Sequence, residues 1–256
     1  MAGSPPLHSF RTRVGGLSLH ARASAPPSAI GGRPVVLVHG YGISGRYMLP
    51  IARRLAAEMP VFIPDLPGHG RSEKPADPFD IPELAEALRA WMDAVGIRRA
   101  ALLGNSMGCQ VVAELALRHP ERVDRIVLVG PTLAPELRKL GRLLPRFLWT
   151  GWWESKPLIP LVIWDFLRAG PRQLITELRA VLADPVEEKM PRIAVPALVL
   201  RGAHDHIVPQ RWAEEAAHSL RTAGLLVVPG AGHALNYSAP DELLRRVRPF
   251  LLDSRI

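Results

Sequence analysis

The chain has 256 residues, of which 48% are hydrophobic and 22% charged, and its formal net charge is +8. Its size suits one domain with an insertion or two small domains, and its single cysteine, Cys109, excludes an intramolecular disulfide and a cysteine-based zinc site. No apolar run approaches the roughly 18 residues of a membrane span. The first ten residues include Pro5, Pro6 and His8 and lack the apolar stretch of a secretory signal, so we expect a cytoplasmic protein.

The positive charge comes almost entirely from arginine, which accounts for 28 of the 32 basic residues. A GC-rich genome imposes this bias on surface positions generally, and the arginines are scattered along the chain. A nucleic-acid-binding protein instead gathers basic residues on one stripe with interleaved aromatic residues. The sequence therefore predicts no nucleic-acid partner.

Short β-rich runs alternate with longer helical patterns, which predicts an α/β fold with a mainly parallel sheet. The chain opens with a hairpin, SFRTRV and LSLHARA around the turn Gly15–Gly16. Further apolar runs predict buried strands at 34–40, 61–64, 100–103, 125–130, 196–202 and 224–230. Between them, helical patterns cover 46–58, 81–95, 107–118, 211–220 and 241–252.

Residues 131–190 break this alternation. They contain seven prolines and four of the six tryptophans, with helical fragments and no convincing buried strand. The sequence therefore predicts a core domain made of 1–130 and 191–256, with residues 131–190 inserted after a strand.

A G-x-S-x-G motif, Gly104-Asn105-Ser106-Met107-Gly108, follows one predicted strand and precedes a predicted helix. A serine is intrinsically a weak nucleophile and must be presented on a sharp strand-to-helix turn, with small neighbours that relieve the crowding, and this context provides both. Ser106 is therefore the candidate nucleophile.

A nucleophilic serine needs a base, and the base needs an acid that orients it. His233 follows the last predicted strand, and Asp205 follows the strand before it. The chain order Ser106, Asp205, His233 is the one that this kind of sheet produces. His204 and His206 flank the acid and are rival candidates for the base.

Two backbone amides are candidates for binding a developing oxyanion. One is the amide of Met107, at the start of a helix, where the dipole favours negative charge. The other is the amide of Tyr41, between two glycines after a predicted strand. Cys109 is expected to be a small buried hydrophobic residue. This chemistry requires no metal or organic cofactor.

Five segments together resemble the α/β-hydrolase family: HGYG (39–42), DLPGHGRS (65–72), GNSMG, the Asp205 segment and GAGH (230–233). The resemblance covers 34–252 apart from the insertion. It implies an eight-stranded, mainly parallel sheet flanked by helices, a serine-hydrolase site, and a helical cap or lid at 131–190. It also implies a structural role for His69.

Within that family, a serine at position 106 disfavours haloalkane dehalogenases and epoxide hydrolases, which carry aspartate there. Asn105 resembles the hydrolases that cleave carbon–carbon bonds in aromatic ring-fission products. Those relatives usually have tryptophan where this chain has Ala234, and a G-x-G-P-G stretch that is absent here. The resemblance therefore favours a carboxylesterase acting on a small-molecule ester. Carbon–carbon hydrolysis and a small-molecule receptor on the same scaffold remain alternatives.

The tryptophan-rich insertion carries the one clue to substrate. Trp149, Trp152, Trp153 and Trp164 are the candidate lining of an apolar pocket for lipophilic groups. A second interpretation has these rings pack the insertion onto the sheet. A third rests the Leu-, Trp- and Arg-rich insertion on a membrane surface. The sequence leaves the oligomeric state open.

Overall fold

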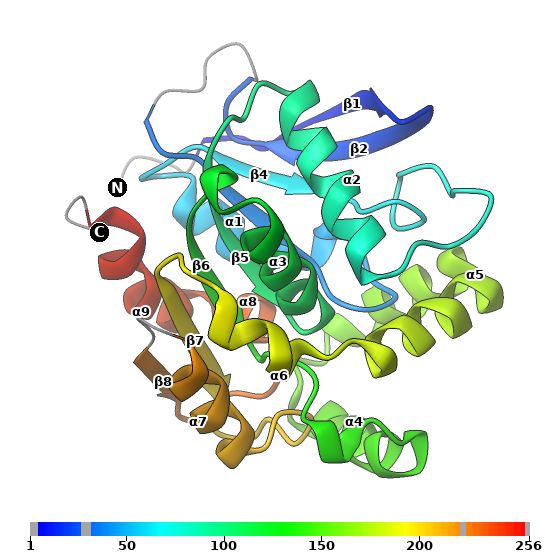
Figure 1. Cartoon of the computed structure of the whole chain (residues 1–256), viewed down its shortest axis with the longest axis vertical. Coiled ribbons are helices and arrows are strands. Elements are labelled where there is room, and N and C mark those ends of the chain that lie inside the picture. The colour runs from blue at the N-terminus through cyan, green and yellow to red at the C-terminus, as the bar shows by residue number, and fades with distance from the viewer. Residues whose placement is uncertain (1–4, 27–31, 221–223, 254–256) are drawn as a thin grey trace.

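The computed structural model describes residues 5–26, 32–220 and 224–253, which form an eight-stranded sheet flanked by helices (Figure 1). The strands lie in the order β1-β2-β4-β3-β5-β6-β7-β8. Their bounds are β1 (His8–Val14), β2 (Leu17–Ala23), β3 (Val35–Val38), β4 (Val61–Pro64), β5 (Ala100–Asn105), β6 (Val123–Val129), β7 (Ala197–Gly202) and β8 (Gly224–Val228).

Strand pairing is antiparallel at one edge of the sheet and parallel elsewhere. β1 and β2 form the expected hairpin, and β2 pairs antiparallel with β4. The other pairs are all parallel. β3, β4, β5 and β7 are buried along their whole length, as strands covered on both faces must be. The prediction of a mainly parallel eight-stranded sheet is confirmed.

Helices cover both faces of the sheet. α2, α3 and α7 pack on one face, and α1, α8 and α9 on the other. A capping box of Asp80 and Glu83 starts α2, and α3 ends just before His119–Pro120, as the sequence predicts. The bounds are α1 (Leu49–Leu55), α2 (Ile81–Ala94), α3 (Met107–Arg118), α7 (Gln210–Ser219), α8 (Leu235–Ser238) and α9 (Pro240–Leu252).

Residues 131–190, called the helical insertion below, hold α4 (Leu140–Trp153), α5 (Leu158–Ala183) and α6 (Val186–Lys189). α5 is kinked at Gly170, which has a φ of 78° and precedes Pro171. α4 and α5 lie together at one end of the sheet (Figure 1). None of the helices in the described part of the chain is both long and apolar enough to cross a membrane.

The sheet topology places the predicted site residues at one edge. Ser106 directly follows β5, Asp205 comes shortly after β7, and His233 lies in the loop after β8. The carboxyl ends of parallel strands meet at the same edge of a sheet, where α/β proteins bind their ligands.

Candidate active site

Ser106 lies on the turn between β5 and α3, with a backbone φ of 57° and ψ of −125°. Among the described residues it is the only residue other than glycine with a positive φ. Such a conformation costs about 1–3 kcal/mol and persists where the surrounding structure enforces it. The strained turn lets the side chain line a cavity instead of the helix core.

The glycines of the motif are required by close backbone contacts. A Cβ on Gly104 would lie 2.4 Å from the carbonyl oxygen of Gly108. A Cβ on Gly108 would lie 2.4 Å from the carbonyl oxygen of Val38 in the neighbouring strand. Any side chain at either position would therefore push α3 away from the sheet and displace Ser106.

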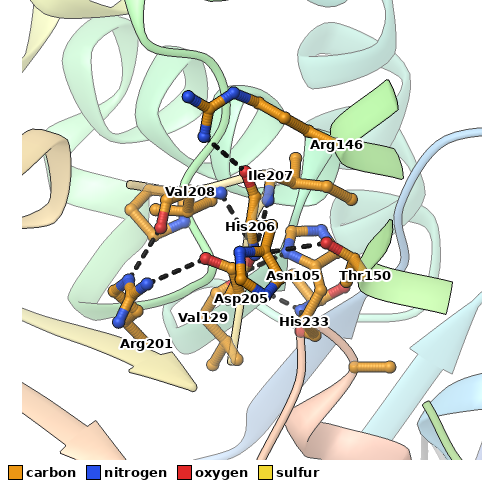
Figure 2. Close-up of polar contacts among 12 residues, drawn as sticks. Asn105, Val129, Arg146, Thr150, Arg201, Asp205, His206, Ile207, Val208 and His233 are labelled. Carbon is orange, nitrogen blue, oxygen red and sulfur yellow. Dashed lines mark hydrogen bonds and ion pairs between the residues drawn. The ribbon is translucent and has the colours of Figure 1, made fainter. Parts of the chain in front are cut away.

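Asp205 and His233 form a hydrogen-bonded pair (Figure 2), with Oδ2 of Asp205 2.7 Å from Nδ1 of His233. The other carboxylate oxygen accepts the amides of Ile207 and Val208, each at 3.0 Å. Asp205 is completely buried. A carboxylate held this way orients the imidazole and keeps the proton on Nδ1, so that Nε2 is the basic nitrogen.

The protonation of His233 follows from two opposing influences. Burial lowers its pKa, whereas the carboxylates of Asp205 and Glu154 raise it, and the net result lies above the ordinary value of 6.5. A general base works in its neutral form. Activity that depends on His233 should therefore fall as the pH drops through this raised pKa.

A cavity of about 260 Å³ brings Ser106 and His233 together. Among the described residues, Nε2 of His233 is buried without a hydrogen-bond partner. A serine nucleophile needs a basic nitrogen that is free to accept its proton, and this nitrogen belongs to a residue that lines the same cavity as Ser106. Apolar side chains form most of the remaining wall, chiefly Ile43, Leu133, Leu143, Phe147, Leu158, Val162, Phe166, Leu178 and Val181.

The two proposed oxyanion donors, Tyr41 and Met107, line the same cavity. Met107 is the first residue of α3, so its N–H belongs to the group that has no acceptor within a helix. The Tyr41 phenol donates to the carbonyl of Leu174 at 2.9 Å, and burial together with Glu177 raises its pKa to about 12. The phenol is thus occupied elsewhere, and the role of the two amides stays a prediction.

The helical insertion holds the loop of Tyr41 through buried carboxylates of α5. Glu177 accepts the amide of Gly42 at 3.0 Å. Asp165 accepts both the amide and the hydroxyl of Ser44, at 2.9 and 2.7 Å. The other oxygen of Glu177 lies 2.7 Å from His69, whose ring is buried. His69 therefore contributes to this support and does not line the cavity.

The structure corrects the expected placement of the four tryptophans. Trp149, Trp152, Trp153 and Trp164 do not contribute to the cavity lining. Their exposed fractions run from 44% for Trp153 to 88% for Trp152, so they are not buried as a core, although Trp153 and Trp149 contact residues of the core domain. The reason is geometric: α4 and α5 each turn a different set of side chains toward the cavity, and the tryptophans lie on the remaining faces.

The rival bases, His204 and His206, lie outside the cavity lining. Trp153 stacks on His204 with 3.8 Å between ring centroids, and Trp149 meets His206 edge-on at 5.9 Å. Two residues of α4 form hydrogen bonds with the backbone of His206 (Figure 2). Arg146 donates to its carbonyl oxygen, and the hydroxyl of Thr150 accepts from its amide. His204 and His206 therefore connect the insertion to the loop that carries Asp205. The histidine that pairs with Asp205 is His233.

Sequence reasoning missed Glu154, which follows α4. One of its oxygens accepts the amides of His233 and Ala234, at 2.6 and 2.9 Å. Its other oxygen is buried and has no partner among the described residues. A Cβ on Gly232 would lie 2.5 Å from the accepting oxygen, which explains the glycine before His233. Burial raises the pKa of Glu154.

Asn105 supports the same loop from the core side. Its side-chain amide donates to the carbonyls of Val129 and His233, at 3.0 and 3.1 Å. The backbone of His233 is thus held by a strand residue on one side and by Glu154 of the insertion on the other. Asn105 has a positioning role here that needs no contact with substrate.

We expect Glu154→Gln to move the acidic limb of the kcat/KM profile to lower pH. The amide oxygen can still accept from His233 and Ala234, but the negative charge that raises the pKa of His233 is gone. The pH dependence of ester hydrolysis measures this shift. Glu188→Gln, at an exposed position of α6, is the matched control. An acidic limb that stays in place would show that the Glu154 charge does not act on His233.

Cys109 is buried, as expected, and its thiol donates to the carbonyl of Gly104 at 3.3 Å. Burial raises the pKa of this thiol, which keeps it protonated. Within the described ranges there is no group of three or more His, Cys, Asp or Glu side chains placed to hold a metal ion.

With this geometry in place, comparison with known proteins gives the family. Residues 35–246 match the model of the alpha/beta hydrolase family, and the chain therefore belongs to that family. The predicted resemblance is confirmed, and with it the prediction that the protein is a hydrolase.

The similar proteins are named for different substrates. The chain is 28% identical over 240 residues to the proposed carbamate hydrolase RutD of Caulobacter sp. (strain K31), covering 85% of this chain and 90% of that protein. A bacterial membrane phospholipase A structure aligns with a TM-score of 0.80 and 26% identity, covering 96% and 86% of the two chains. The enol-lactonase from Burkholderia xenovorans LB400 aligns with a TM-score of 0.81 and 24% identity, covering 95% and 100%, which shows the shared fold.

Proposed function

We propose that the protein is a serine hydrolase that cleaves carboxylic esters with lipophilic groups through Ser106, His233 and Asp205. The observation that carries this proposal is the 2.7 Å pair of Asp205 and His233. The open Nε2 of that pair belongs to a side chain that shares a cavity with Ser106.

The reaction proceeds by two acyl transfers. Oγ of Ser106 attacks the ester carbonyl while Nε2 of His233 takes the hydroxyl proton. The buried Asp205 carboxylate stabilises the imidazolium that forms. His233 then protonates the leaving alcohol, and an acyl-enzyme remains on Ser106. Water repeats the attack with His233 as base, which releases the acid and restores the serine.

The oxyanion of each tetrahedral intermediate accepts hydrogen bonds from the amides of Tyr41 and Met107. Such a donor contributes about 3–4 kcal/mol to transition-state stabilisation in well-studied enzymes. The carboxylates of Glu177 and Asp165 hold the loop of Tyr41 at the amides of Gly42 and Ser44. A fixed loop keeps its donor in place throughout the reaction, which is the condition for electrostatic preorganisation.

The cavity wall supports a lipophilic substrate. Apart from the catalytic groups and a few polar side chains such as Thr132 and Thr150, its lining is aliphatic and aromatic. A wall of this kind binds acyl chains or aromatic groups by burial of apolar surface. The similarity to a phospholipase A, whose name denotes an enzyme of ester bonds, agrees with this class.

The test is hydrolysis of p-nitrophenyl esters from acetate to palmitate, followed as kcat/KM against chain length. We expect turnover that rises from acetate to medium-chain esters, because longer chains bury more apolar surface in the cavity. Turnover of an aromatic ring-fission product and of no ester would assign carbon–carbon hydrolysis instead. Thermal stabilisation by small lipophilic ligands without turnover would assign a receptor.

A further inference from the structure

The outer surface of the helical insertion is unusually apolar. Among the described residues, thirteen large hydrophobic side chains are exposed, and twelve of them lie between positions 140 and 175. The thirteenth is Leu252 in α9. Exposed apolar side chains scattered singly are ordinary, whereas a contiguous patch marks a site of interaction.

The exposed residues are ordered along the helices. In α4, Leu140, Leu144, Leu148 and Trp152 recur every fourth residue and are 53%, 49%, 67% and 88% exposed. Residues four apart lie on the same face of a helix. They therefore form a continuous apolar stripe on the side of α4 away from the cavity.

The first half of α5 carries a similar stripe. Ile159, Ile163 and Leu167 recur at the same spacing and are 50%, 55% and 75% exposed. Ile159, Ile163 and Phe147 of α4 also line the cavity. The mouth of the cavity is thus bordered by the same side chains that form the apolar surface.

Within residues 139–183 of the insertion, the charges are sorted by sign. Seven basic side chains lie between 139 and 183, and all are exposed: Lys139, Arg142, Arg146, Lys156, Arg168, Arg172 and Arg179. The three acidic side chains of this stretch are Glu154, Asp165 and Glu177, and none is exposed. Each of them accepts backbone amides of the core. The outer surface of residues 139–183 therefore combines apolar side chains with cations and lacks an exposed acid.

We propose that this outer surface, made by the exposed side chains of residues 139–183, docks the protein on an anionic lipid bilayer. Apolar side chains enter the boundary between headgroups and acyl chains, and lysine and arginine attract anionic headgroups. A second copy of the chain fits less well. A two-fold dimer brings the same patch of both subunits together, and here it would bring cations against cations, while residues 139–183 supply no exposed acid of their own to pair them.

Docking in this way has a consequence that rests on the proposed function. The cavity mouth, bordered by Phe147, Ile159 and Ile163, would face the bilayer. A lipophilic ester could then pass from the bilayer to Ser106 without crossing water. The docking itself requires no catalysis, so the two proposals can fail separately.

The test uses the full chain with Ser106→Ala, so that no lipid is hydrolysed during the measurement. Its sedimentation is compared with vesicles of phosphatidylcholine alone and with vesicles that also contain phosphatidylglycerol. We expect binding to the anionic vesicles that weakens as salt is added, and much weaker binding to phosphatidylcholine. Equal binding to both, or to neither, would overturn the proposal.

Two pairs of substitutions locate the contact. The first double variant, Leu148→Ser with Trp152→Ser, removes apolar side chains. The second, Lys139→Glu with Lys156→Glu, reverses two charges. We expect each double variant to weaken vesicle binding about tenfold or more. Leu252→Ser is the apolar control, and Arg13→Glu with Arg53→Glu, at exposed positions of β1 and α1, is the charge control.

Thermal unfolding of each variant establishes that it is folded. Vesicle binding that survives both insertion variants would place the contact elsewhere and overturn the assignment of this surface. A dimer without lipid that the Leu148→Ser, Trp152→Ser variant dissociates would assign the surface to a second copy. Binding that persists although no ester is hydrolysed by the wild type would leave docking established and refute only the proposed function.

Discussion

Replacing Ser106 with alanine is expected to lower kcat for p-nitrophenyl ester hydrolysis by about 10⁶-fold, the loss seen when a serine nucleophile is removed from a comparable triad. In the proposed mechanism the Oγ atom forms the acyl-enzyme, and alanine has no hydroxyl at that position. His233 and the oxyanion amides remain, so any residual rate would come from water attacking a bound ester.

The same variant should keep its fold. Alanine retains the Cβ, and the Ser106 side chain makes no capping hydrogen bond to α3 that would be lost. We expect the free energy of unfolding to stay within about 0.5 kcal/mol of the wild type, as for substitutions that remove no structural contact. Ser219→Ala in α7 is the matched control for activity. Hydrolysis by Ser106→Ala at a rate near that of the control would refute the assignment of the nucleophile.

The fold and the chain order of the triad could be predicted because their signals are local. Buried strands appear as short apolar runs, and the elbow needs glycines at 104 and 108 for close contacts with neighbouring backbone. A parallel sheet then brings the loops after β5, β7 and β8 to one edge whatever their separation in sequence. Three short segments were therefore enough to predict the Asp205–His233 pair and its position at the same sheet edge as Ser106.

The support of the triad could not be predicted in the same way. Glu154 accepts a hydrogen bond from His233, which is 79 positions away in the sequence. This contact depends on how α4 packs on the core. Neither residue carries a periodic or motif signal for that contact. One signal was available in retrospect: Glu154, Asp165 and Glu177 are the only acids in the basic and apolar stretch 139–183. All three accept amides of loops around the cavity.

The prediction that the four tryptophans line the cavity was wrong for a related reason. α4 carries large apolar side chains on more than one face, and composition does not say which face lies against the cavity. Leu143, Phe147, Thr150 and Glu154 line the cavity, whereas the stripe that ends at Trp152 faces solvent. The three inward acids accept amides of the core, and Trp153 and Trp149 contact His204 and His206. Polar contacts as well as aromatic ones therefore hold the insertion on the core.

Replacing Asp205 with asparagine is expected to lower kcat by about 10⁴-fold, the loss produced by the wrong imidazole tautomer in a comparable triad. The asparagine oxygen can keep the hydrogen bonds from the amides of Ile207 and Val208. Its NH₂ group then faces Nδ1 of His233 and donates to it. The ring proton moves to Nε2, which can no longer accept the proton of Ser106.

The pH profile separates this cause from a change in basicity. Removing the Asp205 carboxylate lowers the pKa of His233, because that carboxylate is the main influence that raises it against burial. The acidic limb should therefore move to lower pH, while the loss of kcat persists on the plateau where His233 is neutral in both proteins. Asp241→Asn, at an exposed position of α9, is the matched control. A plateau that returns to the wild-type value would mean that Asp205 tunes the pKa of His233 without fixing its tautomer, and the triad mechanism would have to be revised at that step.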